Sequence, residues 1–189
     1  QVLLILGDNL FFGPNLNEII QDALGKNTGA TIFCIESKNP ERFGVIDFNN
    51  QFEAIKIEEK PSQPKTNWVV TGLYIYNNKA SEYAKLLKKS ERGEYEITDL
   101  NNHYLSDNQL SVKKLDKKFS WLDTGTFDSL LEASQLVQTI QKNQGLMIAC
   151  LEEIALKKQW IGIEEVKKQA EKLNNSAYGR YLSALIQNL

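Results

Sequence analysis

The sequence is poor in the residues that covalent and zinc-dependent catalysis use. Its 189 residues include one histidine, two cysteines and one methionine. A Ser–His or Cys–His nucleophile system would have to use His103, which we expect to lie exposed on a short polar helix. The cysteines, Cys34 and Cys150, stand far apart in apolar runs, so we interpret them as buried free thiols of a reducing compartment. Chemistry without a covalent enzyme intermediate is therefore favoured.

Long apolar runs and an excess of one charge are also missing. No stretch approaches the ~20 apolar residues of a membrane span, and no basic-then-apolar leader opens the chain. The formal net charge of −2 gives no electrostatic reason to expect nucleic acid or an acidic membrane as partner. With 42% hydrophobic and 24% charged residues, the composition is typical of a globular protein. We therefore expect a soluble cytoplasmic protein, and the charge still allows a small anionic substrate, because such a ligand needs only a few local cations.

The first residues suggest that the chain begins inside a domain. The only methionine is Met147, and the apolar run Val2–Leu6 starts directly after Gln1. Such a run is typical of a strand buried on both faces of a parallel sheet. The expectation is that this strand needs neighbours on both sides.

The next segments predict an α/β core. Apolar residues recur at helical spacing after Asn15, a candidate N-cap, and before Gly25, a candidate C-terminal stop; they are Leu16, Ile19, Ile20, Ala23 and Leu24. A second apolar run covers Ala30–Ile35. Strand, helix and strand within 35 residues indicate a parallel crossover unit.

The remaining elements divide the chain into two predicted parts. Further strands are expected at 44–48 and 52–57, joined by an Asn49-Asn50 turn, and at 68–76, 110–115 and 119–122. Helices are expected at about 79–89, from about 98, and at 127–142. Only helices follow, at about 151–158, 163–173 and 177–189. We predict an α/β core over residues 1–145 and a small helical region over 146–189.

Two aspartates are candidate metal ligands. Asp8 follows the first strand, and Asp123 follows the strand that ends at Trp121-Leu122. Ligands of open α/β sheets bind beyond the carboxyl ends of strands. Two carboxylates without a histidine or cysteine cluster suit Mg²⁺ rather than zinc. The alternative is that both are ordinary turn and cap residues.

Basic and aromatic residues supply candidate contacts for a phosphorylated ligand. Lys60, fixed by the following proline, offers a point charge for phosphate, with Glu59 beside it as an acceptor for sugar hydroxyls. Arg92 precedes a glycine, and its guanidinium fork matches phosphate. A solvated charge cluster and a lone surface arginine are the alternatives. Tyr74 and Trp121 suit either a sugar ring or the core.

Taken together, these segments resemble the glucose-1-phosphate thymidylyltransferase family over nearly the whole chain. The motifs that carry the resemblance are Leu6-Gly7-Asp8-Asn9, Phe43-Gly44-Val45, Glu58-Glu59-Lys60-Pro61, Val70-Thr71-Gly72-Leu73-Tyr74, Arg92-Gly93-Glu94, Glu96-Ile97-Thr98-Asp99, Trp121-Leu122-Asp123-Thr124-Gly125-Thr126, Gln144-Gly145-Leu146 and Glu152-Glu153-Ile154-Ala155. The resemblance implies the carboxy-terminal two-thirds of such an enzyme. The implied fold is a partial Rossmann-like nucleotidyltransferase mixed sheet with flanking helices and a helical appendage.

The resemblance also implies a reaction and roles for residues. Glucose 1-phosphate would attack the α-phosphorus of dTTP, giving dTDP-glucose for deoxysugars such as rhamnose in cell-surface polysaccharide, and pyrophosphate. Asp8 and Asp123 would hold Mg²⁺, and Lys60 and Arg92 would grip the sugar phosphate as the catalytic cations. The substrate-binding positions would be Gly44, Glu59, Lys60, Val70, Gly72, Tyr74, Arg92 and Trp121. A homotetramer is the implied assembly.

Three departures from the family pattern leave alternatives open. The glycine-rich loop Gly-Gly-x-Gly-Thr-Arg, which cradles the triphosphate, is not in this sequence, so the preference for thymine rests on the resemblance. Phe43 replaces a commoner tyrosine, and Lys117-Lys118 replace an arginine–glycine pair. We expect these 189 residues to be inactive alone. The alternatives are a transferase that uses another nucleotide such as UTP, and a non-catalytic regulatory or assembly subunit.

Overall fold

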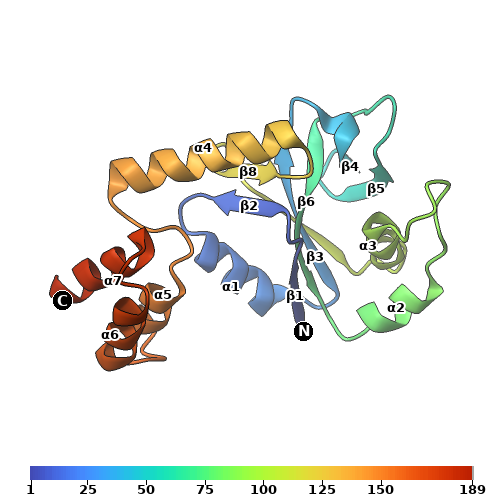
Figure 1. Cartoon of the computed structure of the whole chain (residues 1–189). Helices are drawn as coiled ribbons and strands as arrows, with labels where there is room; N and C mark the ends of the chain where they lie inside the picture. The colour runs from blue at the N-terminus through green and yellow to red at the C-terminus, as the bar shows by residue number, and fades with distance from the viewer. Residues whose placement is uncertain (189) are drawn as a thin grey trace. The chain divides into compact units, whose positions relative to one another are not determined.

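The computed structural model describes residues 1–188 and divides the chain into two compact units, Gln1–Leu130 and Leu131–Leu189. Figure 1 shows strands and helices mixed in the first unit and helices in the second. The division falls within helix α4 (Phe127–Gln144). The sequence-based boundary between residues 145 and 146, which separates the α/β core from the helical region, stays a prediction.

A six-stranded mixed sheet forms the first unit. Five strands follow the order β5-β4-β6-β3-β7, and β1 pairs with β6. Their bounds are β1 Val2–Ile5, β3 Ala30–Glu36, β4 Gly44–Phe48, β5 Ala54–Glu59, β6 Trp68–Tyr76 and β7 Leu110–Lys114. Because β1 and β3 both pair antiparallel with β6, they run parallel to each other with β6 between them. The predicted α/β class and crossover unit are confirmed.

The central strand β6 joins the parts of this sheet. It is the longest strand, and eight of its nine residues are buried. Its first half contacts β4 through the pair Val45–Val69, and its second half contacts β1. A run rich in valine, isoleucine and aromatic residues favours such a strand because their branched or flat side chains pack on a pleated surface.

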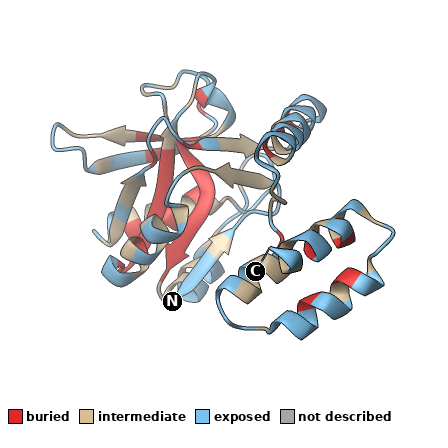
Figure 2. Cartoon of the chain, turned by 90° about the vertical axis from the view of Figure 1, so that its left-hand side faces the viewer, coloured by how far each residue is buried: buried red, intermediate tan, exposed pale blue. Residues whose placement is uncertain are grey.

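Helices cover both faces of the sheet. α1 (Leu16–Lys26) packs its apolar side on one face, against Phe33, Leu73 and Ile75. On the other face, α3 (Ile97–Ser106) and α2 (Ala80–Leu86) pack against Ile32, Tyr74 and Tyr76. Figure 2 shows the buried residues gathered in the central strands between these layers. Alternate residues of β6 therefore pack into two separate cores, one on each face of the sheet.

A separate two-stranded sheet completes the first unit. β2 (Asn9–Phe12) pairs antiparallel with β8 (Ser120–Asp123). The backbone N–H of Leu6 donates to the Gly72 carbonyl at 2.9 Å, which holds the end of β1 against the middle of β6. The chain then continues from this point into β2. This small sheet brings the segments after β1 and after β8 together.

The prediction that the first strand is buried on both faces is wrong for these residues. Val2 and Ile5 are each 54% exposed, and β1 pairs antiparallel with β6 rather than with parallel neighbours. An apolar run indicates a strand but not which other segments cover it. In the described residues, β6 is the only strand that pairs with β1.

Two local predictions also need correction. Asn15 occupies the N-cap position of α1, but its side chain makes no cap hydrogen bond and its backbone is left-handed, with φ of 56°. Gly25 lies inside the helix, which ends at Lys26. The β4–β5 connection is longer than a two-residue turn: it spans residues 49–53, and the Asn49 side chain accepts hydrogen bonds from the N–H groups of Gln51 and Glu53.

The second unit confirms the predicted run of helices after Gly145. α5 (Leu151–Lys157), α6 (Ile163–Lys172) and α7 (Ala177–Gln187) enclose a small core that includes Cys150, Val166 and Leu182. Tyrosines of α7 bind glutamates of α5: Tyr178 donates to Glu152, and Tyr181 donates to Glu153 at 2.6 Å. Among the helices of residues 1–188, none has both the length and the apolar character of a membrane span.

Both cysteines are free and buried, as predicted. Burial raises the pKa of the Cys34 thiol from 9.0 to about 12. Unfolded protein then releases this proton above about pH 9 while folded protein keeps it, so stability is lost as pH rises through this window. We expect the free energy of unfolding to fall more steeply between pH 9 and 11 in the wild type than in Cys34→Ala, by up to about 1.4 kcal/mol per pH unit. Urea unfolding at several pH values measures this free energy in both proteins. Equal slopes of the free energy against pH would contradict the prediction.

Candidate active site

A cavity of about 510 Å³ opens in the first unit. The small sheet, strand β6, the β4–β5 hairpin and the start of α3 all contribute to its lining. Nine residues that the sequence singled out line it: Asp8, Gly44, Glu59, Lys60, Val70, Gly72, Tyr74, Trp121 and Asp123. Arg92, the tenth, contacts this lining through Glu59, with 3.9 Å between Arg92 Nη1 and Glu59 Oε1.

The two aspartates lie side by side. Antiparallel pairing of β2 with β8 sets Asn9 opposite Asp123, and Asp8 immediately precedes it. The backbone N–H and the hydroxyl of Thr124 both donate to the Asp8 carbonyl, at 2.8 and 2.9 Å. A Cβ built on Gly125 would lie 2.9 Å from Asp123 Oδ1 and 3.8 Å from Asp8 Oδ2. The structure therefore brings both carboxylates over Gly125.

The chemistry of this pair suits a hard divalent cation. Oxygen is the only donor element that the two side chains offer, and Asp8 is exposed while Asp123 is half-buried. Within residues 1–188, no group of three or more His, Cys, Asp or Glu is placed to hold a metal ion. Magnesium typically uses one or two protein carboxylates and completes its shell with phosphate and water. The pair fits that pattern, and its role stays a prediction.

Asn9 is a site residue that the sequence reasoning missed. Its Nδ2 donates to Asp8 Oδ1 at 2.8 Å, and its Oδ1 accepts from the Gly72 N–H at 3.1 Å and from Trp121 Nε1 at 2.6 Å. A Cβ at Gly72 would lie 2.5 Å from the Asn9 side chain. Asn9 therefore fixes Asp8 to both β6 and β8. Its place in the segment Leu6-Gly7-Asp8-Asn9, one of those that carry the family resemblance, was the signal in the sequence.

Gly44 and Glu59 face each other across the β4–β5 hairpin. Glu59 Oε2 accepts a hydrogen bond of 2.5 Å from the Thr98 hydroxyl, and a Cβ at Gly44 would lie 3.1 Å from that hydroxyl oxygen. Thr98, to which the sequence alone assigned no role in the site, thus orients the carboxylate toward the cavity. The close approach explains why a residue without a side chain suits position 44.

Lys60 has an unusual backbone for a residue with a side chain. Its φ is 43°, in the left-handed region, and its N–H donates to the Phe43 carbonyl at 3.0 Å. The left-handed conformation costs a non-glycine residue roughly 1–2 kcal/mol. Such strain at the edge of a cavity is typical of functional positions. The side chain is exposed, so it is available to an anion.

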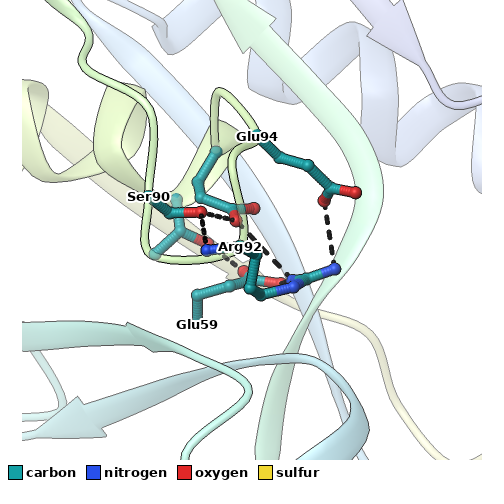
Figure 3. Close-up of polar contacts among 6 residues, drawn as sticks. Glu59, Ser90, Arg92 and Glu94 are labelled. Carbon is teal, nitrogen blue, oxygen red and sulfur yellow. Dashed lines mark hydrogen bonds and ion pairs between the residues drawn. The ribbon is translucent and has the colours of Figure 1, made fainter.

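Arg92 lies among carboxylates in the loop before α3 (Figure 3). Its Nη2 donates to Glu94 Oε2 at 3.0 Å, and its Nη1 lies 3.6 Å from Glu96 Oε1. The hydroxyl of Ser90 donates to Glu96 Oε1 at 2.8 Å and accepts from the Arg92 backbone N–H at 3.2 Å. Neither glutamate nor Ser90 was expected from the sequence to take part.

The aromatic candidates line the cavity. Burial, followed by the nearby charges of Glu59 and Asp8, raises the pKa of Tyr74, so its hydroxyl stays protonated. Trp121 is half-buried and packs 4.8 Å from the ring centre of Phe43. These rings offer a flat apolar wall with an O–H group as a donor or acceptor.

The single histidine belongs to a different surface. His103 does not line the site cavity; its ring stacks on Tyr83 at 5.5 Å between centres. It is half-buried, not exposed as expected. No histidine of the described chain is therefore placed as a general base at the site.

Comparison with known proteins relates this geometry to one family. The family model described as nucleotidyl transferase matches residues 1–140. A glucose-1-phosphate thymidylyltransferase of Neisseria meningitidis is 51% identical over 187 residues, which is 99% of this chain and 65% of that protein. One from Mycobacterium tuberculosis strain H37Rv is 44% identical over the same coverage. The chain thus spans about two thirds of the length of these relatives.

Solved structures agree with the fold. A Bacillus anthracis protein described as a glucose-1-phosphate thymidylyltransferase, in complex with sucrose, is 41% identical with a TM-score of 0.60. The alignment covers 71% of this chain and 53% of that one. A UDP-glucose pyrophosphorylase complexed with UDP-glucose has a TM-score of 0.64 at 20% identity, over 72% of this chain and 55% of that one. The latter likeness concerns the fold alone.

Proposed function

The chain belongs to the nucleotidyl transferase family, and on that premise we propose that it forms the sugar-phosphate and metal half of a glucose-1-phosphate thymidylyltransferase. The observation that carries the proposal is the meeting of Asp8 and Asp123 in the cavity that Glu59 and Lys60 also line. One site then combines a carboxylate pair for a divalent cation, a cation for phosphate and an acceptor for hydroxyls. Relatives with this activity in their names, at 44–53% identity, support the choice of substrates.

Each wall of the cavity has a role in the proposal. Glu59, oriented by Thr98, accepts hydrogen bonds from sugar hydroxyls, and the backbones at Gly44 and Val70 approach the ring closely. Gly72, Tyr74 and Trp121 complete the sugar pocket. Lys60 and Arg92 bind the phosphate of glucose 1-phosphate and offset the negative charge that develops on the transferred group.

The residues present also fit Mg²⁺. Asp8 and Asp123 would hold it, since Gly125 leaves room between their oxygens and Asn9 fixes the Asp8 carboxylate. When bound, the cation would neutralise phosphate charge and help to align the triphosphate. Each aspartate keeps a backbone or side-chain hydrogen bond of its own, which orients it before any ligand arrives.

The proposed reaction needs no nucleophile from the protein. A phosphate oxygen of glucose 1-phosphate attacks the α-phosphorus of dTTP, the bond to the bridging oxygen breaks, and pyrophosphate leaves. Catalysis then consists of positioning the two phosphates in line and offsetting charge. The placement of His103 outside the cavity agrees with such a reaction.

The wider setting follows from the same proposal. The product, dTDP-glucose, would serve the synthesis of deoxysugars such as rhamnose for surface polysaccharide. Both thiols are free and buried, which agrees with a cytoplasmic location. We also propose a homotetramer as the assembly, in which the complete gene product works.

The test is pyrophosphate release by the complete gene product with glucose 1-phosphate, MgCl₂ and each common nucleoside triphosphate. We expect dTTP to exceed the other triphosphates in kcat/KM by about tenfold or more, and the 189-residue chain alone to give only background release. Preference for UTP would favour the other transferase. Binding of glucose 1-phosphate without any turnover would favour a non-catalytic subunit.

A further inference from the structure

The guanidinium of Arg92 is shared among three carboxylates, and these contacts are unequal. It bonds Glu94 through Nη2 at 3.0 Å, while Nη1 lies 3.6 Å from Glu96 and 3.9 Å from Glu59 (Figure 3). Arg92 itself does not line the site cavity. The shortest of these contacts of Arg92 therefore goes to Glu94, which does not line the cavity either.

Glu94 and Glu96 differ in how firmly they are held. The Glu94 side chain is 61% exposed, so its bond to Arg92 is an exposed ion pair of little strength. The Glu96 side chain is only 12% exposed, and it also accepts the Ser90 hydroxyl at 2.8 Å. Glu96 is the N-cap residue of α3, whose first turn carries Thr98, the residue that orients Glu59.

The loop itself keeps Arg92 near both partners. The Gly93 N–H donates to the Ser90 carbonyl, and the Ser90 N–H donates to the Glu94 carbonyl, each at 2.8 Å. Gly93 has φ of 79°, which closes this turn without strain. Arg92 can therefore exchange Glu94 for another anion by rotating its side chain, while the backbone stays in place.

We propose that Glu96 is a positioning residue for Arg92 and that Glu94 is a displaceable competitor for the phosphate of the substrate. The inference rests on the proposed function. Glu94 holds the guanidinium outside the cavity until a sugar phosphate, with its greater charge, takes its place. Glu96, fixed by Ser90, keeps the Nη1 side of Arg92 next to Glu59 throughout.

The proposal predicts opposite effects for two equal changes of charge. In Glu94→Gln, the competitor loses its charge, so glucose 1-phosphate should bind more tightly, with a Kd roughly two- to fivefold lower. In Glu96→Gln, the guanidinium loses its fixed anchor, so the Kd should rise about tenfold. A general electrostatic effect on an anionic ligand would lower the Kd in both, because each variant removes one negative charge.

The experiment is isothermal titration calorimetry on the complete gene product. Glu91→Gln is the matched control, because Glu91 lies exposed in the same loop and its change removes the same charge. The ligands are glucose 1-phosphate, inorganic phosphate and glucose. Both phosphates should show the opposite shifts, whereas the affinity for glucose should be the same in Glu94→Gln as in the control. Ser90→Ala, which keeps all charges, should weaken phosphate binding in the same direction as Glu96→Gln.

Steady-state kinetics supply a second measurement. Glu94→Gln should lower the KM for glucose 1-phosphate with kcat little changed, while Glu96→Gln should raise KM and lower kcat. Shifts of equal sign in Glu94→Gln, Glu96→Gln and Glu91→Gln would overturn the inference. If Arg92→Lys binds phosphate as well as the wild type, the inference fails although the proposed function stands. If the wild type does not bind glucose 1-phosphate at all, the proposed function fails first.

Discussion

Replacement of Asp123 by asparagine is expected to lower kcat/KM of the complete gene product about 100- to 1,000-fold. The reason is the loss of charge at one of the two carboxylates that meet over Gly125. The local fold should survive, since Asp123 Oδ1 accepts the Gly125 N–H at 3.1 Å and the amide oxygen of asparagine can accept it equally. A steady-state assay of pyrophosphate release measures the effect.

This substitution separates the two interpretations of the aspartates that the sequence left open. A turn residue needs only an acceptor, so asparagine would be almost neutral; a metal ligand needs the negative charge. Asp128→Asn is the matched control, because Asp128 is an exposed residue of the first turn of α4, and it should stay within about twofold of the wild type. Electron paramagnetic resonance of added Mn²⁺ gives a readout independent of turnover, and unchanged Mn²⁺ binding in Asp123→Asn would contradict the assignment.

Replacement of Lys60 by alanine or glycine is expected to lower kcat/KM by about 100-fold or more while the two variants differ in stability. Both variants lose the cation that we propose binds the phosphate of glucose 1-phosphate. Because the backbone φ at this position is 43°, alanine keeps the strain and glycine relieves it. We expect the free energy of unfolding of Lys60→Gly to exceed that of Lys60→Ala by about 1 kcal/mol.

Enzyme assay and urea unfolding of both variants test this expectation together. Lys65→Ala removes an exposed positive charge from the loop that follows and should leave kcat/KM within about twofold. Equal kcat/KM of Lys60→Ala and Lys65→Ala would contradict the proposed phosphate-binding role of Lys60. Equal stability of the alanine and glycine variants would mean that the left-handed conformation carries no cost here.

Sequence patterns were sufficient to predict the strands and helices that local residue preferences determine. The run Trp68–Tyr76 forms β6 with the expected bounds, and the three C-terminal helices begin at residues 151, 163 and 177, as predicted. Branched apolar residues between loop signals, or apolar residues at helical spacing, decide such segments without help from distant parts of the chain. The same signals did not tell what covers β1, because coverage depends on other segments.

The site was predictable only in part, for a related reason. Single polar residues next to strand ends gave the candidates Asp8 and Asp123, whose common cavity depends on the β2–β8 pairing. Asn9 accepts hydrogen bonds from Gly72 and Trp121, which lie 63 and 112 positions away in sequence. A local sequence pattern does not predict contacts over such separations. The phosphate-binding role of Arg92 stays a prediction, and its contacts with carboxylates depend on how the loop and α3 fold together.

The central position of β6 has a consequence for the local opening motions of the native protein. Val70 and Tyr74 face the cavity from a strand that also anchors the cores on both faces of the sheet. Transient openings of a native protein start where few buried contacts hold the chain, and strands shared by two cores open last. The sugar pocket is therefore anchored in the most persistent part of the first unit, whereas the Arg92 loop is exposed from Glu91 to Tyr95 and can rearrange without disturbing that pocket.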